Sequence, residues 1–238
     1  ISGMSYATHF AALSGRSLRP YLRDGELPFY LGVLGASVLL IAVYVWQAGF
    51  YPEFATALRH AAFNTVSVAT TLGYASTDYS KWPFFAPLWM LFLCSFVTCA
   101  GSTGGGIKMM RAVILYKQVF REITHAMHPN ATTFVKLGGT VVPNKIILAV
   151  LGFGFLYMAS TIFFTLALAA SGADIVSAFS AAVACFNNTG PGLGLVGPDS
   201  NYGVLNDFQV WICSFAMLLG RLEIFTLLVV LTPAFWRK

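Results

Sequence analysis

Two glycine-containing turns carry the residue types that could do chemistry in this chain. The first reads TTLG and the second NNTG, and each ends an apolar stretch too short for a membrane span. Glycine can adopt positive φ and turn its carbonyl group towards an axis without a side-chain clash. Rings of such carbonyl groups replace the water shell of K⁺ in channel filters. The candidate filter residues are Thr70, Thr71, Leu72, Gly73, Asn187, Asn188, Thr189 and Gly190.

A third candidate segment, GSTGGGIK, directly follows an eighteen-residue apolar run from Phe84 to Gly101. It departs from a phosphate-binding P-loop, because Lys108 falls one place late, Met109 replaces the hydroxyl residue and the preceding run is too long for a strand. Three consecutive glycines favour an irregular loop, which at membrane depth must face a cavity or be buried in protein. A small-residue contact between helices is the alternative.

The composition places these segments in a membrane protein. Of the 238 residues, 57 % are hydrophobic and 10 % are charged, and the mean hydropathy is +0.72. Soluble domains carry about 25 % charged residues, so we predict an integral membrane protein. The four cysteines lack C-x-x-C spacing, which predicts buried hydrophobic side chains rather than a zinc or redox site. The chain opens on polar sequence without a signal peptide, as expected of a fragment whose earlier part is absent.

Long and short apolar stretches alternate along the chain. The long ones, at the roughly 20 residues needed for a membrane span, are residues 27–50, 83–101, 146–170 and 208–236. The short ones, 52–72 and 174–189, are more typical of re-entrant half-helices. The expected fold is therefore an all-α membrane protein. Its repeats read transmembrane helix, re-entrant pore helix, filter turn, transmembrane helix.

The two halves superpose as an internal repeat. Placing Gly73 on Gly190 gives an offset of 117 residues, which also aligns the starts of both first spans. Either turn alone is also typical of an ordinary loop between buried helices, and it is their common register that favours a site. Transporters with internal repeats bind substrate at the repeat interface. The same offset places the glycine segment opposite residues 218–225, in the middle of the last span.

Arg221 lies opposite Gly104 in this offset, at the centre of an apolar stretch. A charge there is costly and normally faces the bundle interior or water. We expect Arg221 beside the glycine loop, with a buried salt bridge as the structural alternative. Glu223 lies about 200° further round a helix and receives no firm role, although it could pair with Lys108 or Arg111. The candidate gate residues are Gly101, Ser102, Thr103, Gly104, Gly105, Gly106, Lys108 and Arg221.

The distribution of charge predicts the orientation. Nine of the fourteen basic residues fall in three stretches that share one side, namely Arg16, Arg19, Arg23, Lys117, Arg121, Lys136, Lys145, Arg237 and Lys238. The positive-inside rule makes that side cytoplasmic, so both half-helices enter from outside. The net charge of +5 is thus an orientation signal, and nucleic acid is not an expected partner. The acidic outer loops are explained by solubility at least as well as by cation attraction.

Four motifs in this order resemble the Trk/Ktr/HKT superfamily of potassium transporters, and are most similar to its bacterial Trk membrane subunits. They are SVATTLGYASTDY (67–79), AGSTGGGIKMMR (100–111), CFNNTGPGLGLVGP (185–198) and GRLEIFTLLVVLTPAFW (220–236). The resemblance implies four repeats around one pore, filter glycines that favour K⁺, an intramembrane gating loop and a pore arginine near it. It divides this chain into the cytoplasmic end of the second repeat (1–26), the third repeat (27–121), a cytoplasmic linker (122–142) and the fourth repeat (143–238).

The resemblance also implies the setting. The remaining repeats of the same subunit, a second copy, membrane lipid and cytoplasmic nucleotide-binding regulatory subunits are the expected partners, in the bacterial inner membrane. No tightly bound cofactor is expected, and K⁺ is the transported ion. The expected function is K⁺ uptake through a gated filter, and the alternative is a carrier that couples K⁺ to H⁺ or Na⁺ through Glu223. An intramembrane enzyme using His60 and Ser67 is disfavoured, because no acid or second histidine lies near them.

Overall fold

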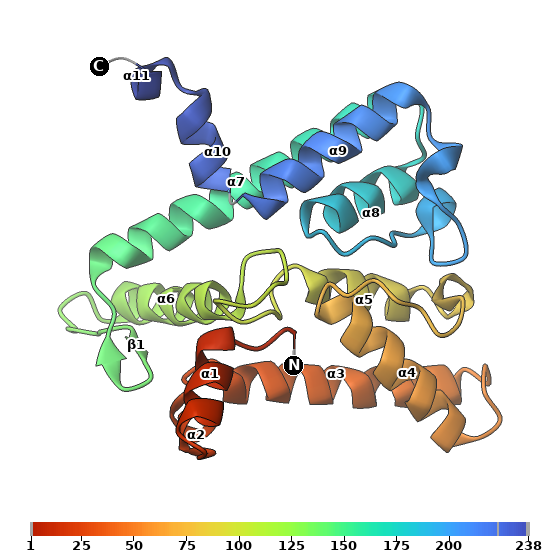
Figure 1. Cartoon of the computed structure of the whole chain (residues 1–238). Coiled ribbons are helices and arrows are strands. Elements are labelled where there is room, and N and C mark those ends of the chain that lie inside the picture. The colour runs from red at the N-terminus through yellow and green to blue at the C-terminus, as the bar shows by residue number, and fades with distance from the viewer. Residues whose placement is uncertain (1, 223, 237–238) are drawn as a thin grey trace.

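The computed structural model describes residues 2–222 and 224–236 and is mainly helical (Figure 1). Two short helices, α1 (Tyr6–Ser14) and α2 (Arg19–Arg23), precede the first long helix. The first half then runs α3 (Leu27–Gln47), α4 (Phe54–Ala69) and α5 (Phe85–Cys94). Glu26 precedes α3, and Pro28 lies in its first turn. Proline is compatible with the first turn of a helix because its missing N–H would have had no partner there.

The second half repeats this order. It consists of α7 (Asn144–Ala170), α8 (Ile175–Phe186) and α9 (Asp207–Arg221). Of the described helices, α3 and α7 are long and apolar enough to cross a membrane. With 16 and 12 residues, α4 and α8 extend only about 24 and 18 Å at 1.5 Å per residue, less than the roughly 30 Å of a bilayer core. Both short helices are therefore too short to cross such a layer.

The second predicted span requires a correction. Residues 83–101 were expected to remain helical up to the glycine segment, but α5 ends at Cys94. The backbone leaves the helix early because two carbonyl groups after its end receive hydrogen bonds from beyond the loop. Ile107 donates to Ser95 at 2.6 Å and Met109 donates to Thr98 at 2.8 Å. The irregular segment between α5 and α6 (Met109–Met127) is consequently longer than the glycine motif alone.

The last predicted span, 208–236, is also interrupted. Helix α9 ends at Arg221, and α10 (Ile224–Leu231) and α11 (Pro233–Trp236) follow it. Pro233 has no backbone N–H to donate, so α10 cannot continue through it. The break falls opposite the glycine loop in the 117-residue offset, so both halves interrupt their final helix at a corresponding place. The predictions about Glu223 fall outside the described residues.

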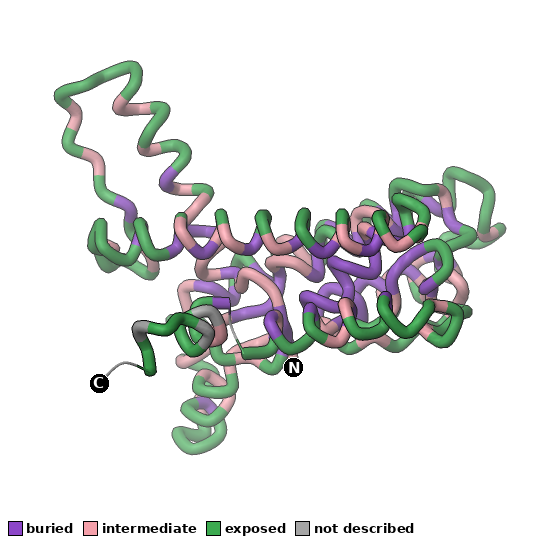
Figure 2. Tube along the Cα trace, turned by 90° about the horizontal axis from the view of Figure 1, so that it is seen from above, coloured by how far each residue is buried: buried purple, intermediate pink, exposed green. Residues whose placement is uncertain are grey.

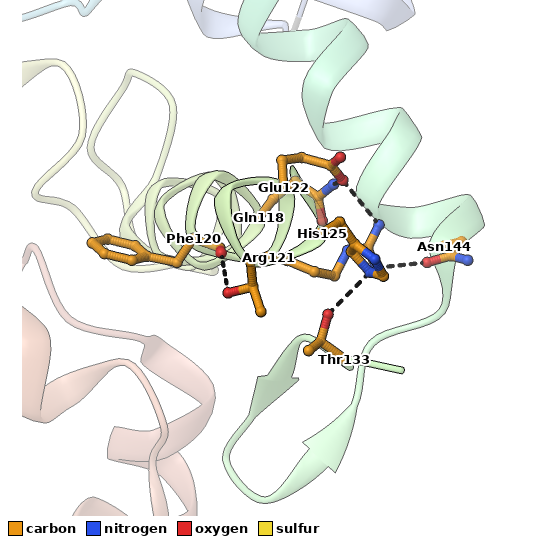
Figure 3. A network of polar contacts seen from close by, with 8 residues as sticks. Gln118, Phe120, Arg121, Glu122, His125, Thr133 and Asn144 are labelled. Carbon is orange, nitrogen blue, oxygen red and sulfur yellow. Dashed lines mark hydrogen bonds and ion pairs between the residues drawn. The ribbon is translucent and has the colours of Figure 1, made fainter. Parts of the chain in front are cut away.

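The connection between the halves contains a small β-hairpin that the all-α prediction did not include. Strands β1 (Lys136–Leu137) and β2 (Thr140–Val141) pair antiparallel around Gly138 and Gly139, which both have positive φ. Two consecutive glycines in this conformation are typical of a two-residue hairpin turn. The predicted boundary between residues 121 and 122 falls inside α6, which continues to Met127. His125 of α6 contacts the Thr133 hydroxyl at 3.1 Å and joins the hairpin segment to this helix (Figure 3).

Buried residues gather in the middle of the molecule, where the short helices lie against the long ones (Figures 1 and 2). One cluster joins α7, α8 and α9 through residues such as Phe164 and Phe186. A second joins α3, α4 and α5, and also takes in Val183 of α8 and Leu193. The two halves therefore share a core. Short 3₁₀ turns lie in the segments that follow α4 and α8, at η1 (Tyr79–Lys81), η2 (Gly194–Val196) and η3 (Tyr202–Val204).

Candidate functional site

The carboxyl ends of α4 and α8 have the same hydrogen bonds. After α4, Thr71 donates its N–H to the Val68 carbonyl at 3.0 Å, and Leu72 donates to the Ser67 carbonyl at 2.8 Å. After α8, Asn188 and Thr189 make the corresponding bonds at 3.0 and 2.9 Å. This pair of bonds defines a Schellman motif, which satisfies two of the last carbonyl groups of a helix. The later carbonyl groups of each helix end, which the motif does not use, are free to face other partners.

The sign of φ alternates along both turns. Thr71 and Asn188 share a φ of 55°, and Gly73 and Gly190 have φ values of 81° and 103°, whereas the intervening residues are not in the positive-φ region. In an extended strand, successive carbonyl groups point to opposite sides. Alternating the sign of φ brings them to the same side, which is the arrangement that a carbonyl-lined ion site requires. Non-glycine residues rarely adopt positive φ, so Thr71 and Asn188 mark turns that the surrounding structure holds in place.

The two turns meet at Gly73. A Cβ atom built on Gly73 would lie less than 3.0 Å from the Thr189 carbonyl oxygen, closer than real Cβ atoms approach other atoms. Gly73 is therefore required both for its positive φ and for the close approach of the neighbouring turn. Gly190 differs, because no atom lies within 4 Å of the corresponding position and only its φ demands glycine.

The side chains of the first turn residues point into the protein. Asn187 is completely buried, accepts a hydrogen bond from the Tyr157 hydroxyl at 3.0 Å and donates to the Val183 carbonyl at 2.8 Å. Thr70 is buried and donates its hydroxyl to Val66. Backbone groups, and not these side chains, are thus what the turns can offer to an ion. Leu72 is the exposed member of the first turn.

The glycine segment packs directly beneath both turns. Cβ atoms on Gly104, Gly105 and Gly106 would each lie less than 3.0 Å from another residue: the Thr98 side chain, the Asn187 carbonyl and the Ser95 carbonyl, respectively. Three consecutive glycines are needed because backbone and side-chain atoms surround all three positions. Gly105 also accepts a hydrogen bond from the Thr98 hydroxyl at 2.9 Å and donates to the Thr71 hydroxyl at 3.4 Å. The loop is therefore in contact with the turns of both halves.

Two cationic side chains bind the carbonyl groups of this loop. Lys108 donates to the carbonyls of Ser102 and Gly104, and Arg221 donates to the Thr103 carbonyl at 2.7 Å. The sequence offset therefore placed Arg221 correctly beside the glycine segment. These residues line a cavity of about 470 Å³ together with Tyr6, Gly101, Gly105, Gly106, Phe153, Tyr157, Phe186, Gly220 and Ile224. All eight candidate gate residues belong to this one loop or to its cavity.

Glu26 and Tyr202 contact the site, and sequence reasoning missed both. Glu26 is 6 % exposed, and its carboxylate accepts a hydrogen bond at 2.8 Å from the N–H of Ala100, the residue before the loop. The Tyr202 hydroxyl donates to the Gly190 carbonyl at 2.8 Å. Neither residue lies in a motif or in the register of the repeat. Glu26 lies 74 residues from Ala100 and Tyr202 lies 12 residues from Gly190, so no short stretch of sequence indicated these contacts.

Burial raises the pKa of the Glu26 carboxyl, although the hydrogen bond from Ala100 opposes the shift. A raised pKa means that the folded protein binds this proton more tightly than the unfolded chain, so ionisation of Glu26 destabilises the fold as pH rises. Replacing Glu26 with Gln removes the buried charge and keeps an acceptor for Ala100. We expect Glu26→Gln to raise the melting temperature of the full-length protein in detergent at neutral and alkaline pH. The gain should shrink as pH falls towards the usual glutamate pKa of about 4.3.

Glu122→Gln is the matched control for this prediction, because the Glu122 side chain is 63 % exposed. It should change the melting temperature little at any pH. A Glu26→Gln protein that is less stable than the parent at neutral pH would show that the site requires the negative charge.

The two residues of the disfavoured enzyme hypothesis lie in different surroundings. His60 contacts the Ser76 hydroxyl at 3.1 Å and stacks on the Tyr51 ring. The Ser67 hydroxyl is buried and has no hydrogen-bond partner among the described residues. Within those same parts of the chain, no group of three or more His, Cys, Asp or Glu side chains could hold a metal ion. The four cysteines are free and buried, as predicted.

Comparison with known proteins now gives the family. The model of the TrkH family, described as a cation transport protein, matches residues 39–238. The chain belongs to the TrkH family. This confirms the resemblance drawn from the four motifs, and it agrees with a mainly helical membrane fold.

Individual TrkH relatives match over the full length of this chain. The Trk system potassium uptake protein TrkH of Salmonella typhimurium is 44 % identical over 238 residues, and that of Escherichia coli (strain K12) is 43 % identical. Both matches cover 100 % of this chain and 49 % of the relative. The crystal structure of the potassium transporter TrkH from Vibrio parahaemolyticus superposes with a TM-score of 0.93 at 39 % identity, over 99 % of this chain and 50 % of that one. The chain thus spans about half the length of its TrkH relatives, which are transporters and not enzymes.

Proposed function

We propose that this chain contributes two quarters of a K⁺ uptake pathway within a larger TrkH-type subunit. The observation that carries the proposal is the shared geometry of the two turns. Each follows a half-helix, each alternates the sign of φ, and the two meet where Gly73 faces the Thr189 carbonyl. The carboxyl end of a half-helix also carries the negative end of the helix dipole, which stabilises a cation there. K⁺ would be held by backbone carbonyl groups of residues 70–73 and 187–190.

The glycine loop acts in this proposal as the gate. It packs against both turns and offers carbonyl groups that Lys108 and Arg221 occupy. A loop with no regular secondary structure can rearrange without breaking a helix. The backbone hydrogen bonds from Ile107 to Ser95 and from Met109 to Thr98 form the neck of the loop and do not involve its glycines. Transport then requires the loop to leave the space beneath the filter.

The full-length protein tests this function in a bacterial strain that lacks other K⁺ uptake systems. Expression of the protein should restore growth at low K⁺, and isotope flux in liposomes should follow the K⁺ gradient and the membrane potential. Flux that follows a pH or Na⁺ gradient would instead support the coupled carrier. Glu223, on which that alternative rests, lies outside the described residues, and no observation favours the carrier here. Absence of K⁺ flux from a folded, full-length protein would refute the proposal.

Arg221 is proposed to be a fixed positive barrier beneath the filter. A unit charge about 8 Å from a passing cation, at an effective dielectric constant near 20, costs it roughly 2 kcal/mol. That corresponds to about a thirty-fold effect on ion occupancy. Arg221→Gln removes the charge and keeps a donor for the Thr103 carbonyl, so K⁺ flux per folded subunit should rise by about this factor. Arg221→Lys retains the charge and should keep flux low; a well-folded Gln variant with parental flux would contradict the barrier.

Residues 27–121 and 143–238 serve as the third and fourth pore repeats, joined by a cytoplasmic linker, with residues 1–26 as the end of the second repeat. The first and second repeats of the same subunit supply the rest of the pore. The whole subunit works as a homodimer in the bacterial inner membrane, under the control of cytoplasmic nucleotide-binding subunits. The TrkH relatives, about twice as long as this chain, support the need for the other repeats.

A further inference from the structure

A cavity of about 420 Å³ lies between α6 and the hairpin segment, away from the proposed pore. Three cationic side chains line it, and three aromatic rings complete most of its wall. They are Lys117, Arg121, Lys136, Tyr116, Phe120 and Phe134. None of the described residues that line this cavity is acidic. We call it the basic cavity.

The basic cavity lies level with the start of the α7 membrane helix. Arg121 donates to the Asn144 side chain at 2.9 Å, and Asn144 is the first residue of α7 (Figure 3). From Ile146 on, the exposed residues of α7 are apolar, and Leu148, one turn after Asn144, is 68 % exposed. An apolar helix surface long enough to span a bilayer is suited to contact with acyl chains. The cations therefore stand where the hydrocarbon layer gives way to lipid headgroups, on the side that the positive-inside rule makes cytoplasmic.

The positive charge of the basic cavity is not neutralised by nearby acids. Lys117 donates to the Lys136 backbone carbonyl at 2.7 Å, which orients its ammonium group and leaves it two further protons to donate. In the described parts of the chain, neither Lys117 nor Lys136 lies within 4.0 Å of a carboxylate oxygen. Arg121 is 3.7 Å from Glu122, the one acid beside it, and the Glu122 side chain is largely exposed. Among the described residues, Glu122 thus offsets part of the charge of Arg121, and the two lysines have no acidic partner.

Apolar surface adjoins the cations. Tyr116 and Phe134 are 65 % and 68 % exposed, and the rings of Tyr116 and Phe120 pack against each other with centroids 4.8 Å apart. Aromatic rings are enriched at the level of lipid headgroups because one end can be apolar and the other polar. A free anion such as inorganic phosphate would use the cations and leave these rings in water. A phospholipid would use both.

We propose that the basic cavity binds the headgroup of an anionic membrane phospholipid, with its acyl chains along the exposed rings of α6 and the surface of α7. The phosphate would accept hydrogen bonds from Lys117 and Lys136, while Arg121 is held by Asn144 at the back of the cavity. Such a site would tie the connection between the two halves of the chain to the membrane surface.

The test uses the full-length protein, purified in detergent from membranes that contain both phosphatidylglycerol and phosphatidylcholine. Native mass spectrometry should detect phosphatidylglycerol retained in preference to phosphatidylcholine. Lys117→Gln/Lys136→Gln should weaken this retention roughly thirty-fold, as expected for the loss of two basic residues near a membrane surface. Arg59→Gln/Lys81→Gln removes the same charge from the predicted outer side and should retain the lipid as the parent does. The single variant Lys136→Gln replaces the double one if the latter does not fold.

Three outcomes would overturn the proposal. Equal retention of both lipids by the parent would remove the evidence for a headgroup site. Complete release of phosphatidylglycerol by millimolar inorganic phosphate would identify the site as one for free phosphate. Unchanged lipid retention by a folded Lys117→Gln/Lys136→Gln protein would show that these lysines do not hold a headgroup. If the same variant no longer binds a soluble protein partner, the cavity is a protein-docking face instead.

Discussion

Gly73→Ala in the full-length protein is expected to lower the ratio of K⁺ to Na⁺ uptake at least about tenfold. The added Cβ would lie less than 3.0 Å from the Thr189 carbonyl oxygen, so the neighbouring turn must move. Alanine at the φ of 81° costs roughly 1–2 kcal/mol more than glycine, which adds a tendency of the turn to change conformation. A cost of about 1.4 kcal/mol already changes an equilibrium tenfold. Ion uptake in a strain lacking other K⁺ uptake systems measures the ratio.

Two glycines provide matched controls for this substitution. Gly172 follows α7 with a φ of 95°, and no atom lies within 4 Å of its Cβ position, so Gly172→Ala carries backbone strain away from the turns. Gly190→Ala carries strain inside the second turn without the clash. We expect parental selectivity for Gly172→Ala and an intermediate ratio for Gly190→Ala. Parental selectivity in a normally expressed Gly73→Ala protein would be evidence against a filter at this turn.

Deletion of residues 103–106 is expected to raise K⁺ flux in the resting state at least about tenfold. It removes the glycines that pack beneath both turns and the carbonyl groups that Lys108 and Arg221 bind on Gly104 and Thr103. The neck of the loop should survive, because the hydrogen bonds of Ile107 and Met109 join residues outside the deletion. Isotope flux into liposomes, divided by the amount of folded protein, measures the effect.

Gly105→Ala separates removal of the loop from disturbance of its packing. Its Cβ would collide with the Asn187 carbonyl while the loop keeps its length, so stability should fall and flux should not rise. If the deletion protein folds and its flux per subunit is no higher than that of the parent, the glycine loop is a packing element and not a gate.

Local sequence was sufficient for much of the architecture. The long apolar stretches predicted α3 and α7, and the two short ones predicted α4 and α8. Hydropathy is a sum over neighbouring residues, so it predicts where a chain can be buried in lipid. The glycines at positions 73 and 190 likewise predicted turns with positive φ, because backbone sterics depend on the residue itself. The common register of the two turns could also be predicted from the sequence, because it depends on the positions of these glycines.

Hydropathy predicted the wrong helix ends at two places, where long-range contacts compete with the local preference for a helix. Residues 95–101 are apolar enough to continue α5, yet the helix ends at Cys94 because Ser95 and Thr98 pair with residues beyond the loop. The break after Arg221 was likewise absent from the predicted last span. At the first of these places the chain gains the contacts of Gly105 with both turns, which a continuous helix would not make.

The membrane class, the repeated helix pattern, the glycine turns and the proximity of Arg221 to the loop could all be predicted from the sequence, since these depend on residue type and on a single offset. The tertiary structure alone decided which atoms meet: Gly73 with the Thr189 carbonyl, Ala100 with the Glu26 carboxylate, and Gly190 with the Tyr202 hydroxyl. Such contacts join residues from 12 to more than 100 positions apart, and they depend on how helices pack side by side. Packing is set by the shapes of whole surfaces, and no short stretch of sequence encodes it.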